Sequence, residues 1–398
     1  MKILVSNAGS TSLKFKLFEM DKEQALCDAR VERVGSRDRA IFTYKNLVSG
    51  ASERHEGLCV PEYTDGVQLF LSAVTDAAKG VIRDIGEVEA VGFKTVFAPG
   101  FLGDHELTDA AMAALEEGVR VAPAHNIPYI ETINVFKRLL PAARMVGAFE
   151  TDFHRTVPLE RQIYSVPYEW YEKYGVRRYG YHGASHGYVA GRVADLTAGA
   201  ARRVISCHLG GSGSLCAILD GRSVDSTCGF SLQSGLPHSS RAGDIDPYIF
   251  PFLLGEGLTA EEITRGITKN GGLLGVSGLS GDMRDLEAAI AAGNERARLA
   301  VEMYLHAIVS GVGALYATLG GLDALVFTGG IGENSAMVRS RVCKALAHLG
   351  AWLDEAKNGP AEGERVVSRD DSPAQVWVIP ANEELNVARR ALALLKKG

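Results

Sequence analysis

The sequence predicts an α/β protein of two lobes that arose by internal duplication, and three observations support this fold class. A chain of 398 residues exceeds the size of one ordinary hydrophobic core. Residues 2–18 have the pattern of a β-hairpin, in which an apolar run leads through a small polar turn at 7–12 to alternating apolar and polar residues. Residues 203–219 repeat that order, so that 5–17 aligns with 206–218.

Both hairpin turns suit phosphate binding. The turn at 7–12 has few bulky side chains and several backbone N–H and hydroxyl donors, and the turn at 210–214 is richer still in glycine. We expect the two turns to face each other across a cleft and to hold a nucleotide's phosphates. For the first turn alone, an ordinary polar hairpin explains the pattern equally well.

The composition excludes several classes of protein. A formal net charge of −6 argues against broad nucleic-acid binding, and contents of 46% hydrophobic and 23% charged residues are typical of globular proteins. The six cysteines have no C-x-x-C spacing, which predicts reduced thiols in the cytoplasm and neither a zinc site nor a disulfide framework. We expect no apolar run long enough to cross a bilayer and no signal peptide.

The first lobe is expected at residues 1–150, joined by a C-terminal helix at 384–398. Lys94 follows a predicted buried strand, where open α/β sheets usually carry site residues, although a surface lysine fits equally. His125 stands in a predicted turn, where a structural role is the alternative. After the hairpin we expect short peripheral strands at 29–54, a helix at 67–82 and a strand at 88–93. A second helix at 108–120, a turn at 122–126 and a strand at 145–149 complete the lobe.

Three ionisable residues follow the last strand of this lobe, namely Glu150, Asp152 and His154. Their position at a strand end suggests a metal or acid/base cluster. A solvated strand end explains them nearly as well.

The second lobe, expected at 151–383, contains a possible nucleophile motif. Residues 183–187 match the G-x-S-x-G pattern of a hydrolase elbow centred on Ser185. Such an elbow should follow a buried apolar strand, whereas Arg177 and Arg178 precede this one. The sequence therefore favours Ser185 as a helix N-cap over a hydrolase nucleophile.

Two further stretches of the second lobe suggest ligand contacts. Arg241 lies in a polar loop among small residues, followed by Asp244 and Asp246, which suit either a metal or a helix cap. A strand, a glycine-rich turn and a helix are expected at 326–349, an arrangement that favours nucleotide binding. Helices are expected at 248–268 and 283–318, a flexible segment at 271–284 and a strand at 376–379.

The usual nucleotide-binding fingerprints are absent. The chain has no G-x-x-x-x-G-K-[ST] and no G-x-G-x-x-G that opens a βαβ unit. Phosphate binding by two repeated hairpins instead points to the actin-like ATPase architecture.

Seven motifs in chain order resemble the acetate kinase family, over nearly the whole sequence. They are the motifs at 7–14, 122–126, 178–186, 206–210, 241–247, 327–335 and 382–385. The resemblance implies an actin-like fold of two duplicated ribonuclease H-like domains with an interlobe cleft, usually as a homodimer. It also implies an enzyme that uses Mg²⁺ and transfers the γ-phosphoryl group of ATP to a short carboxylic acid.

The resemblance also implies roles for residues at matched positions. The transferred phosphate and the metal would be contacted by Asn7, Ser10, Ser12 and Lys14, with Glu384 near the Mg²⁺. His125, His182 and Arg241 would lie at the phosphoryl-transfer centre and stabilise charge there. The nucleotide would be contacted by His208, Leu209, Gly210, Asp282, Met283, Arg284, Gly330, Ile331, Gly332 and Asn334.

The chain departs from the family pattern at several of these positions. Phe93 and Lys94 replace a His-Arg pair, and lysine keeps the charge but loses the planar two-pronged contact with a carboxylate or phosphoryl group. Glu150 replaces an aspartate. Gly211 and Ser212 replace an Asn-Gly pair, and the acyl pocket has Ala124, Tyr181 and Leu232 in place of a larger aliphatic residue, a phenylalanine and a proline.

These changes suggest a divergent carboxylate kinase whose preferred acid is larger or more polar than acetate. In this hypothesis Ala124 adds room, and Lys94 and the Tyr181 hydroxyl add polar contacts. Two alternatives are a non-catalytic nucleotide-binding member of the fold and a kinase that uses pyrophosphate or another nucleotide as donor.

Overall fold

The computed structural model describes residues 1–9 and 11–397, and the side chain of Ala124 is outside the description. The chain divides into two compact units. Unit 1 comprises Met1–Asp152 and Asn382–Gly398, and unit 2 comprises Phe153–Ala381.

Unit 1 is built on one mixed sheet of eight strands in the order β5-β4-β3-β2-β1-β6-β8-β7. The opening hairpin is confirmed, with Leu4 opposite Leu17 and Ser6 opposite Phe15. β1 runs parallel to β6, and β6 runs parallel to β8. The strands are β1 (Lys2–Gly9), β2 (Ser12–Glu19), β3 (Gln24–Glu32), β4 (Ser36–Asn46), β5 (Ser52–Val60), β6 (Ala90–Phe93), β7 (Asp104–Glu106) and β8 (Arg144–Ala148).

The prediction of short peripheral strands at 29–54 is wrong. β3, β4 and β5 are 9, 11 and 9 residues long and extend the same sheet. β4 alternates buried Ala40, Phe42 and Tyr44 with less buried residues, and helix α1 (Tyr63–Val74) packs beside these strands. α1 begins at a capping box between Glu62 and Asp65 and so starts and ends earlier than the predicted helix.

Helices cover both faces of the first sheet. Val387 of α14 (Glu383–Leu395) lies so close to Gly92 that a Cβ there would be 3.0 Å from its Cγ1. Phe93, the next residue of β6, points to the other face and meets Phe136 of α3 (Pro123–Leu139). α2 (Asp109–Glu117) precedes α3, and the turn predicted at 122–126 is wrong because Pro123 is the first residue of α3.

Unit 2 repeats the same topology. Its sheet has the order β11-β10-β9-β12-β14-β13, with β9 antiparallel to β10 and parallel to β12, which is parallel to β14. The order β3-β2-β1-β6-β8 in unit 1 corresponds strand for strand to β11-β10-β9-β12-β14, which confirms the predicted duplication. The strands are β9 (Arg203–Leu209), β10 (Gly213–Leu219), β11 (Arg222–Ser226), β12 (Ala324–Thr328), β13 (Arg365–Val366) and β14 (Gln375–Val378).

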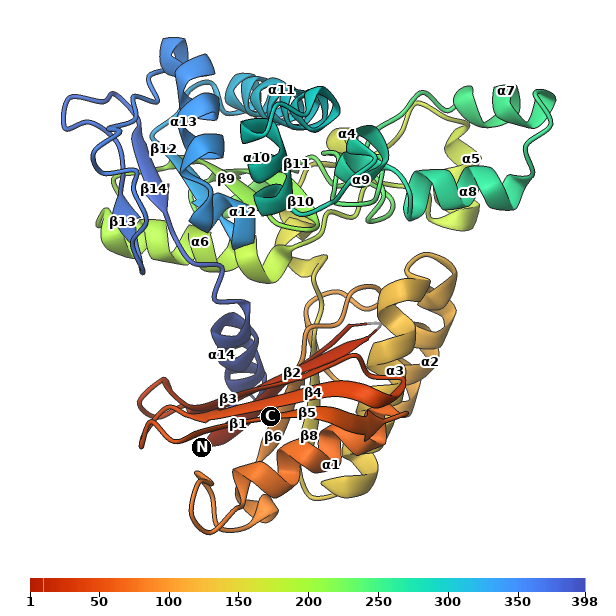
Figure 1. The fold of residues 1–398 in the computed structure, drawn as a ribbon, viewed down its shortest axis with the longest axis vertical. Helices are drawn as coiled ribbons and strands as arrows, with labels where there is room; N and C mark the ends of the chain where they lie inside the picture. Colours follow the sequence, from red (N-terminus) through yellow and green to blue (C-terminus); the bar gives the residue numbers. More distant parts are fainter. Residues whose placement is uncertain (10, 398) are drawn as a thin grey trace. The chain divides into compact units, whose positions relative to one another are not determined.

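The second sheet also lies between helices. Figure 1 shows α6 (Gly183–Leu196) on one side of the sheet and α10 (Met283–Ala291), α11 (Glu295–Leu319) and α13 (Ala336–Ala345) on the other. The remaining helices are α4 (Leu159–Gln162), α5 (Tyr168–Tyr174), α7 (Ile249–Gly255), α8 (Ala260–Thr268), α9 (Gly272–Ser277) and α12 (Gly329–Asn334).

Two segments predicted as irregular are short helices. The stretch at 271–284 contains α9, and the glycine-rich turn after β12 is α12. Gly272 opens α9 with a φ of +60°, and a Cβ there would lie 2.1 Å from the carbonyl oxygen of His238. Only glycine allows this close approach, which sequence periodicity does not reveal.

Helix α11 is long and apolar enough to span a membrane by length and composition alone. This differs from the expectation that no segment reaches that length. Val301, Ile308 and Val312 of α11 are buried in the hydrophobic core of unit 2. A core helix passes the same test, so the length of α11 is weak evidence for a membrane span.

Candidate active site

Three predicted site residues of unit 1 lie where parallel strands end. Asn7 is near the end of β1, Lys94 follows β6, and Glu150 lies two residues after β8. Because β1, β6 and β8 are parallel, their carboxyl ends share one edge of the sheet. The topology therefore brings an amide, an ammonium group and a carboxylate to the same edge.

Lys94 is held by carboxylates. Its Nζ donates to Glu383 Oε2 at 2.8 Å, and the two side chains are only 18% and 16% exposed. Burial lowers the pKa of Lys94, but the nearby carboxylates of Glu383 and Glu150 outweigh burial and raise it overall. Lys94 therefore carries a permanent positive charge.

A buried tyrosine positions Asn7. The hydroxyl of Tyr129 donates to Asn7 Oδ1 at 2.6 Å. Burial is the main cause that raises the pKa of Tyr129, so this hydroxyl stays protonated. Tyr129 lies one helical turn after His125 on α3, a relation that the turn predicted at 122–126 does not reveal.

The start of α14 is backbone-strained. Its N-cap, Asn382, has φ 37° and ψ 42° in the left-handed region, which costs about 1–3 kcal/mol. Glu383 and Glu384 follow in the first turn, and Glu383 meets Lys94. The sequence points to Glu384 and not to Glu383, because two adjacent glutamates give no indication of which one faces the lysine.

The residues expected to bind a metal offer oxygen ligands. Among the described residues, no group of three or more His, Cys, Asp and Glu side chains could hold a metal ion. Mg²⁺ needs only one or two protein oxygens when phosphate oxygens and water complete its shell. The amide oxygen of Asn7 and the carboxylate of Glu384 are hard ligands of this kind, so the donor set fits Mg²⁺.

The first hairpin places its remaining candidates around Asn7. Lys14 is exposed on β2 directly opposite Asn7, and Ser12 is opposite Gly9. The carbonyl oxygen of Gly9 accepts a hydrogen bond from the Tyr63 hydroxyl at 2.8 Å. Ser10, the other residue expected to contact phosphate, lies outside the described residues.

In unit 2, His182 is a strained helix cap. It is the N-cap of α6, with φ 59° and ψ 30°, a left-handed conformation that is uncommon for a non-glycine residue. Its Nδ1 lies 2.8 Å from Ser214 Oγ, and its ring stacks on that of His208 at 4.5 Å. Ser185 is not the N-cap that the sequence predicts; it is a fully buried residue of α6 whose Oγ lies 2.8 Å from His208 Nδ1.

Arg241 offers an anion-binding group. Burial lowers the pKa of its guanidinium, and no carboxylate in the described part of the chain offsets that effect. Burial and the charge of Arg241 lower the pKa of nearby His238 to about 3, so this histidine stays neutral. Its Nδ1 accepts the backbone N–H of Gly213 at 3.0 Å, which ties the Arg241 loop to the second hairpin. A half-buried cation with no acidic partner favours a bound phosphate or carboxylate.

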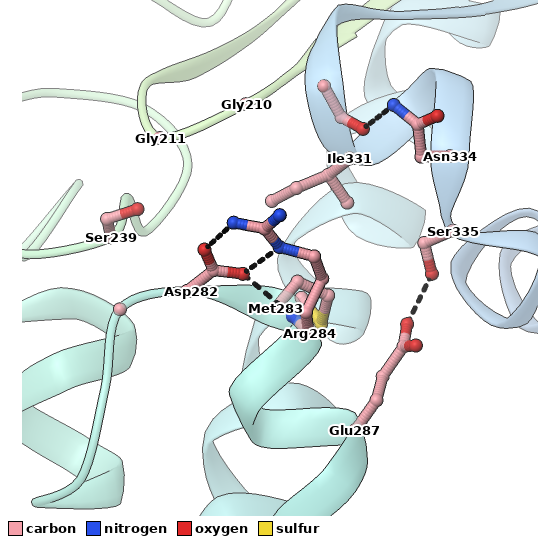
Figure 2. A pocket seen from close by; sticks show the side chains of 12 residues that line it. Gly210, Gly211, Ser239, Asp282, Met283, Arg284, Glu287, Ile331, Asn334 and Ser335 are labelled. Carbon is pink, nitrogen blue, oxygen red and sulfur yellow. Dashed lines mark hydrogen bonds and ion pairs between the residues drawn. The ribbon is translucent and has the colours of Figure 1, made fainter. Parts of the chain in front are cut away.

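A cavity of about 670 Å³ opens beside the second hairpin of unit 2 (Figure 2). Asp282 caps α10 and binds the Arg284 guanidinium through two contacts of 3.0 and 2.6 Å. Glu287 accepts a hydrogen bond from Ser335, the N-cap of α13, at 2.6 Å. The cavity is lined by Gly210, Gly211, Ser239, Gly281, Asp282, Met283, Arg284, Glu287, Gly330, Ile331, Asn334 and Ser335.

Seven of the ten residues expected to contact nucleotide line this cavity. Leu209 and Gly332 are buried and do not line it, and His208 lies beside His182 instead. Glu287, Ser239 and Ser335 also line the cavity but were not predicted. Glu287 and Ser239 stand in a helix and a loop without a phosphate-binding pattern, so no sequence signal points to them, whereas Ser335 belongs to the segment at 326–349 that favours nucleotide binding.

Other predicted groups have structural partners. Tyr181 donates its hydroxyl to the Phe230 carbonyl at 2.8 Å, and Leu232 is buried nearby in sequence. Asp244 and Asp246 accept backbone N–H groups of Gly235 and Tyr248, both at 2.8 Å, so each has a backbone partner. Neither is the helix cap that the sequence suggests, because α7 begins at Ile249 and its N-cap, Tyr248, makes no side-chain capping bond.

The cluster suspected at Glu150, Asp152 and His154 is not a metal site within the described residues. Asp152 lies 3.7 Å from Arg390 in unit 1. His154 uses both ring nitrogens inside unit 2, with Ser223 Oγ and the Tyr181 carbonyl each at 2.9 Å. Ionisable residues that are close in sequence have separate partners here.

The chain matches the model of the Acetokinase family over residues 2–389. It belongs to the acetokinase family. It is 41% identical to the acetate kinase of Natranaerobius thermophilus over the whole length of both proteins, and 40% identical to that of Bacillus subtilis over 99% of this chain and 100% of the relative.

Solved structures agree with this assignment. The acetate kinase of Porphyromonas gingivalis superposes with a TM-score of 0.89 at 38% identity, covering 99% of each chain. A propionate kinase from Francisella tularensis gives 0.90 at 31% identity, covering 98% of each. The acetokinase family member described here therefore has the duplicated actin-like fold and is a carboxylate kinase, a phosphotransferase with a carboxyl group as acceptor.

Proposed function

We propose that this acetokinase family member transfers the γ-phosphoryl group of ATP, with Mg²⁺, to a short carboxylic acid and forms an acyl phosphate and ADP. The observation that carries the proposal is Arg241, a half-buried guanidinium without a carboxylate to offset its burial. It stands two residues from Ser239, which lines the 670 Å³ cavity. A cation beside a nucleotide-sized cavity suits the terminal phosphate of a nucleotide.

The cavity supports nucleotide binding. Its volume lies within the range of small-molecule sites, and glycines 210, 211 and 330 line it without side chains that would keep phosphate oxygens away from the backbone. Asp282 holds the Arg284 guanidinium in one orientation, and a planar cation of this kind can stack on a purine base.

The carboxylate acceptor would attack the γ-phosphorus in line, so the protein contributes position and charge rather than covalent chemistry. In this proposal, Lys94 neutralises the acceptor or the phosphoryl oxygens, and His182 and Arg241 donate hydrogen bonds to the transferring group. Asn7 and Glu384 would hold Mg²⁺, which neutralises phosphate charge when bound.

The preferred acid is proposed to be larger than acetate. Lys94 supplies one point charge, and its ammonium group also binds Glu383. It therefore orients a substrate carboxylate less strictly than a planar guanidinium would. The Tyr181 hydroxyl is engaged with the Phe230 carbonyl, so the extra polar contact expected from it is not part of the proposal. One structural relative is named a propionate kinase, which is consistent with larger acids within this fold.

A panel of short acids tests the proposal. The protein, MgATP and each acid would be incubated with hydroxylamine, which converts an acyl phosphate to a measurable hydroxamate. We expect product with several acids and the highest kcat/KM for one larger than acetate. Acetate as the best substrate would contradict the acid preference, ATP binding without any hydroxamate would favour a non-catalytic role, and activity only with pyrophosphate would favour a different donor.

We also propose a homodimer. Helices α5 and α7 of unit 2 carry several exposed aromatic side chains, among them Tyr168, Trp170 and Phe252, and Tyr248 before α7 is 76% exposed. A second copy of the chain would cover such a surface. Sedimentation would give a dimer, and Tyr248→Lys with Phe252→Glu would give a monomer; a monomeric parent protein would contradict the proposal.

The free, mostly buried cysteines are consistent with a cytoplasmic enzyme.

A further inference from the structure

A continuous chain of hydrogen bonds connects Ser206 to His182. Ser206 Oγ on β9 lies 2.9 Å from His186 Nδ1, and His186 Nε2 lies 2.8 Å from Ser214 Oγ on β10. The same Ser214 oxygen lies 2.8 Å from His182 Nδ1. All four side chains are buried, and His182 and His186 occupy successive turns at the start of α6.

The protons of this chain can be counted. A hydroxyl has one proton to donate, and a neutral imidazole has one N–H and one accepting nitrogen. His186 is neutral, because burial first, and the neighbouring His154 and His208 second, lower its pKa well below the usual value. The chain therefore has two directions: from Ser206 towards His182, or the reverse.

Ser206 decides between the two directions. If its hydroxyl donates to His186 Nδ1, then His186 Nε2–H donates to Ser214, and Ser214 donates to His182 Nδ1. In the reverse direction the Ser206 hydroxyl accepts from His186, and its own proton has no acceptor among the described hydrogen bonds of the chain. A buried hydroxyl proton without an acceptor costs about 1–3 kcal/mol, so the first direction is favoured.

Cys228 gives a third arrangement to weigh. Its sulfur lies within reach of the Ser214 hydroxyl, which could donate to it while accepting from both histidines. Sulfur is a weak acceptor and an imidazole nitrogen a strong one. The Ser214 proton therefore goes to His182 Nδ1, and the thiol can donate to the remaining lone pair of Ser214.

We propose that His186 and Ser214 are positioning residues that hold His182 as its Nε2–H tautomer, with the ring nitrogen Nε2 as a fixed donor to the transferring phosphoryl group. The inference rests on the proposed function, because it assigns His182 to that group. The consequence is a histidine that acts as a hydrogen-bond donor and not as a base. The Nε2–H group of His182 would then donate a hydrogen bond to the equatorial oxygens and stabilise the negative charge that develops on them.

The strained cap conformation of His182 fits this role. A left-handed non-glycine residue persists where its surroundings hold it, and the bond to Ser214 fixes the ring at its Nδ1 edge. The opposite edge, which carries Nε2, is the one that the tautomer makes a donor. The left-handed backbone and the hydrogen bond to Ser214 therefore hold the His182 ring in the same orientation.

The test is ¹⁵N NMR of the histidine rings in the full-length protein without substrate, at pH 7.5. The ¹⁵N shifts distinguish protonated from unprotonated ring nitrogens, and His182→Gln assigns the His182 signals. We expect a protonated Nε2 and an unprotonated Nδ1 for His182. A protonated Nδ1 in the parent protein would overturn the inference, whatever the variants do.

Variants connect the tautomer to the reaction. Ser214→Ala should mix the two tautomers of His182 and lower kcat about 10- to 100-fold, with the KM for ATP within about twofold. Ser214→Thr keeps the hydroxyl, so its His182 tautomer and its kcat should be those of the parent protein. Ser223→Ala is the matched control, because Ser223 Oγ binds buried His154 at 2.9 Å outside the chain; it should change neither.

The outcomes separate this inference from the proposed function. An unchanged tautomer in Ser214→Ala would overturn the positioning role even if the protein is an active kinase. The expected tautomer in a protein that phosphorylates no acid would leave the hydrogen-bond chain standing and overturn the proposed function instead.

Discussion

The Lys94 ammonium group donates to the Glu383 carboxylate at 2.8 Å and joins the end of β6 to the first turn of the C-terminal helix α14. The two residues are 289 positions apart in sequence. Both side chains are mostly buried, so removing one charge would leave the other charge buried without a partner. This ion pair therefore links the stability of unit 1 to the geometry of its candidate site.

Glu383→Gln should destabilise unit 1. The neutral amide keeps the shape but leaves Lys94 with a weaker partner, and we expect a loss of about 2 kcal/mol in the free energy of unfolding. Denaturant titration and, separately, scanning calorimetry would measure this loss in the free energy of unfolding. Glu384→Gln, one residue along the same helical turn, is the control and should cost less than about 0.5 kcal/mol. Equal losses in the two variants would contradict the importance of the ion pair.

Lys94→Arg should alter the choice of acid. A guanidinium offers two parallel N–H donors to a carboxylate, so we expect the ratio of kcat/KM for acetate to that for the preferred acid to rise about tenfold. The measurement is the hydroxamate assay with both acids. Lys45→Arg, an exposed lysine on β4, is the matched control. An unchanged ratio would show that Lys94 does not set the acid preference.

Tyr129→Phe should impair catalysis without unfolding the protein. The variant removes the 2.6 Å hydrogen bond to Asn7 and frees the amide to rotate, so kcat should fall about tenfold. Tyr44→Phe removes another buried hydroxyl of unit 1, which lies 3.4 Å from the Lys79 carbonyl, and serves as the control. If both variants keep full activity, Tyr129 has no positioning role.

Unit 2 should lose stability as the pH falls below about 6.5. Burial is the main cause that lowers the pKa of His154 to about 4 and of His238 to about 3. The unfolded chain takes up a proton on each at about pH 6.5, whereas the folded chain does not. Each histidine then costs about 1 kcal/mol of stability at pH 5.5, and the loss is absent above neutral pH.

Unfolding temperatures measured from pH 5 to 8 would check this dependence. His154→Gln should give a shallower slope than the parent protein, because one titrating group is gone. A stability that does not change between pH 5.5 and 7.5 would contradict burial of these two rings in neutral form.

The sequence predicts the parts of this fold that are local. The hairpins at 2–18 and 203–219 are visible because alternation reports which face of a strand is buried, and the position of Lys94 follows from the apolar run before it. Their repetition predicted the duplication that the two strand orders confirm.

The sequence does not reveal contacts between distant segments. Tyr129 meets Asn7 across 122 residues, and Glu383 meets Lys94 across 289, so no pattern in either segment identifies the partner. The sequence favours a turn at the start of α3 because Ala122 and Pro123 lack the side-chain cap that usually marks a helix start. The hydrogen-bond chain to His182 likewise needed the pairing of β9 with β10 and the packing of α6.

The most direct test of the account is a ³¹P NMR time course of the protein with MgATP and the acid that performs best in the panel. We predict equal amounts of ADP and acyl phosphate, with both lost in His182→Gln and Arg241→Ala. ADP that appears with inorganic phosphate and no acyl phosphate, or ATP that remains unchanged with every acid, would contradict the assignment of this protein as an ATP-dependent carboxylate kinase.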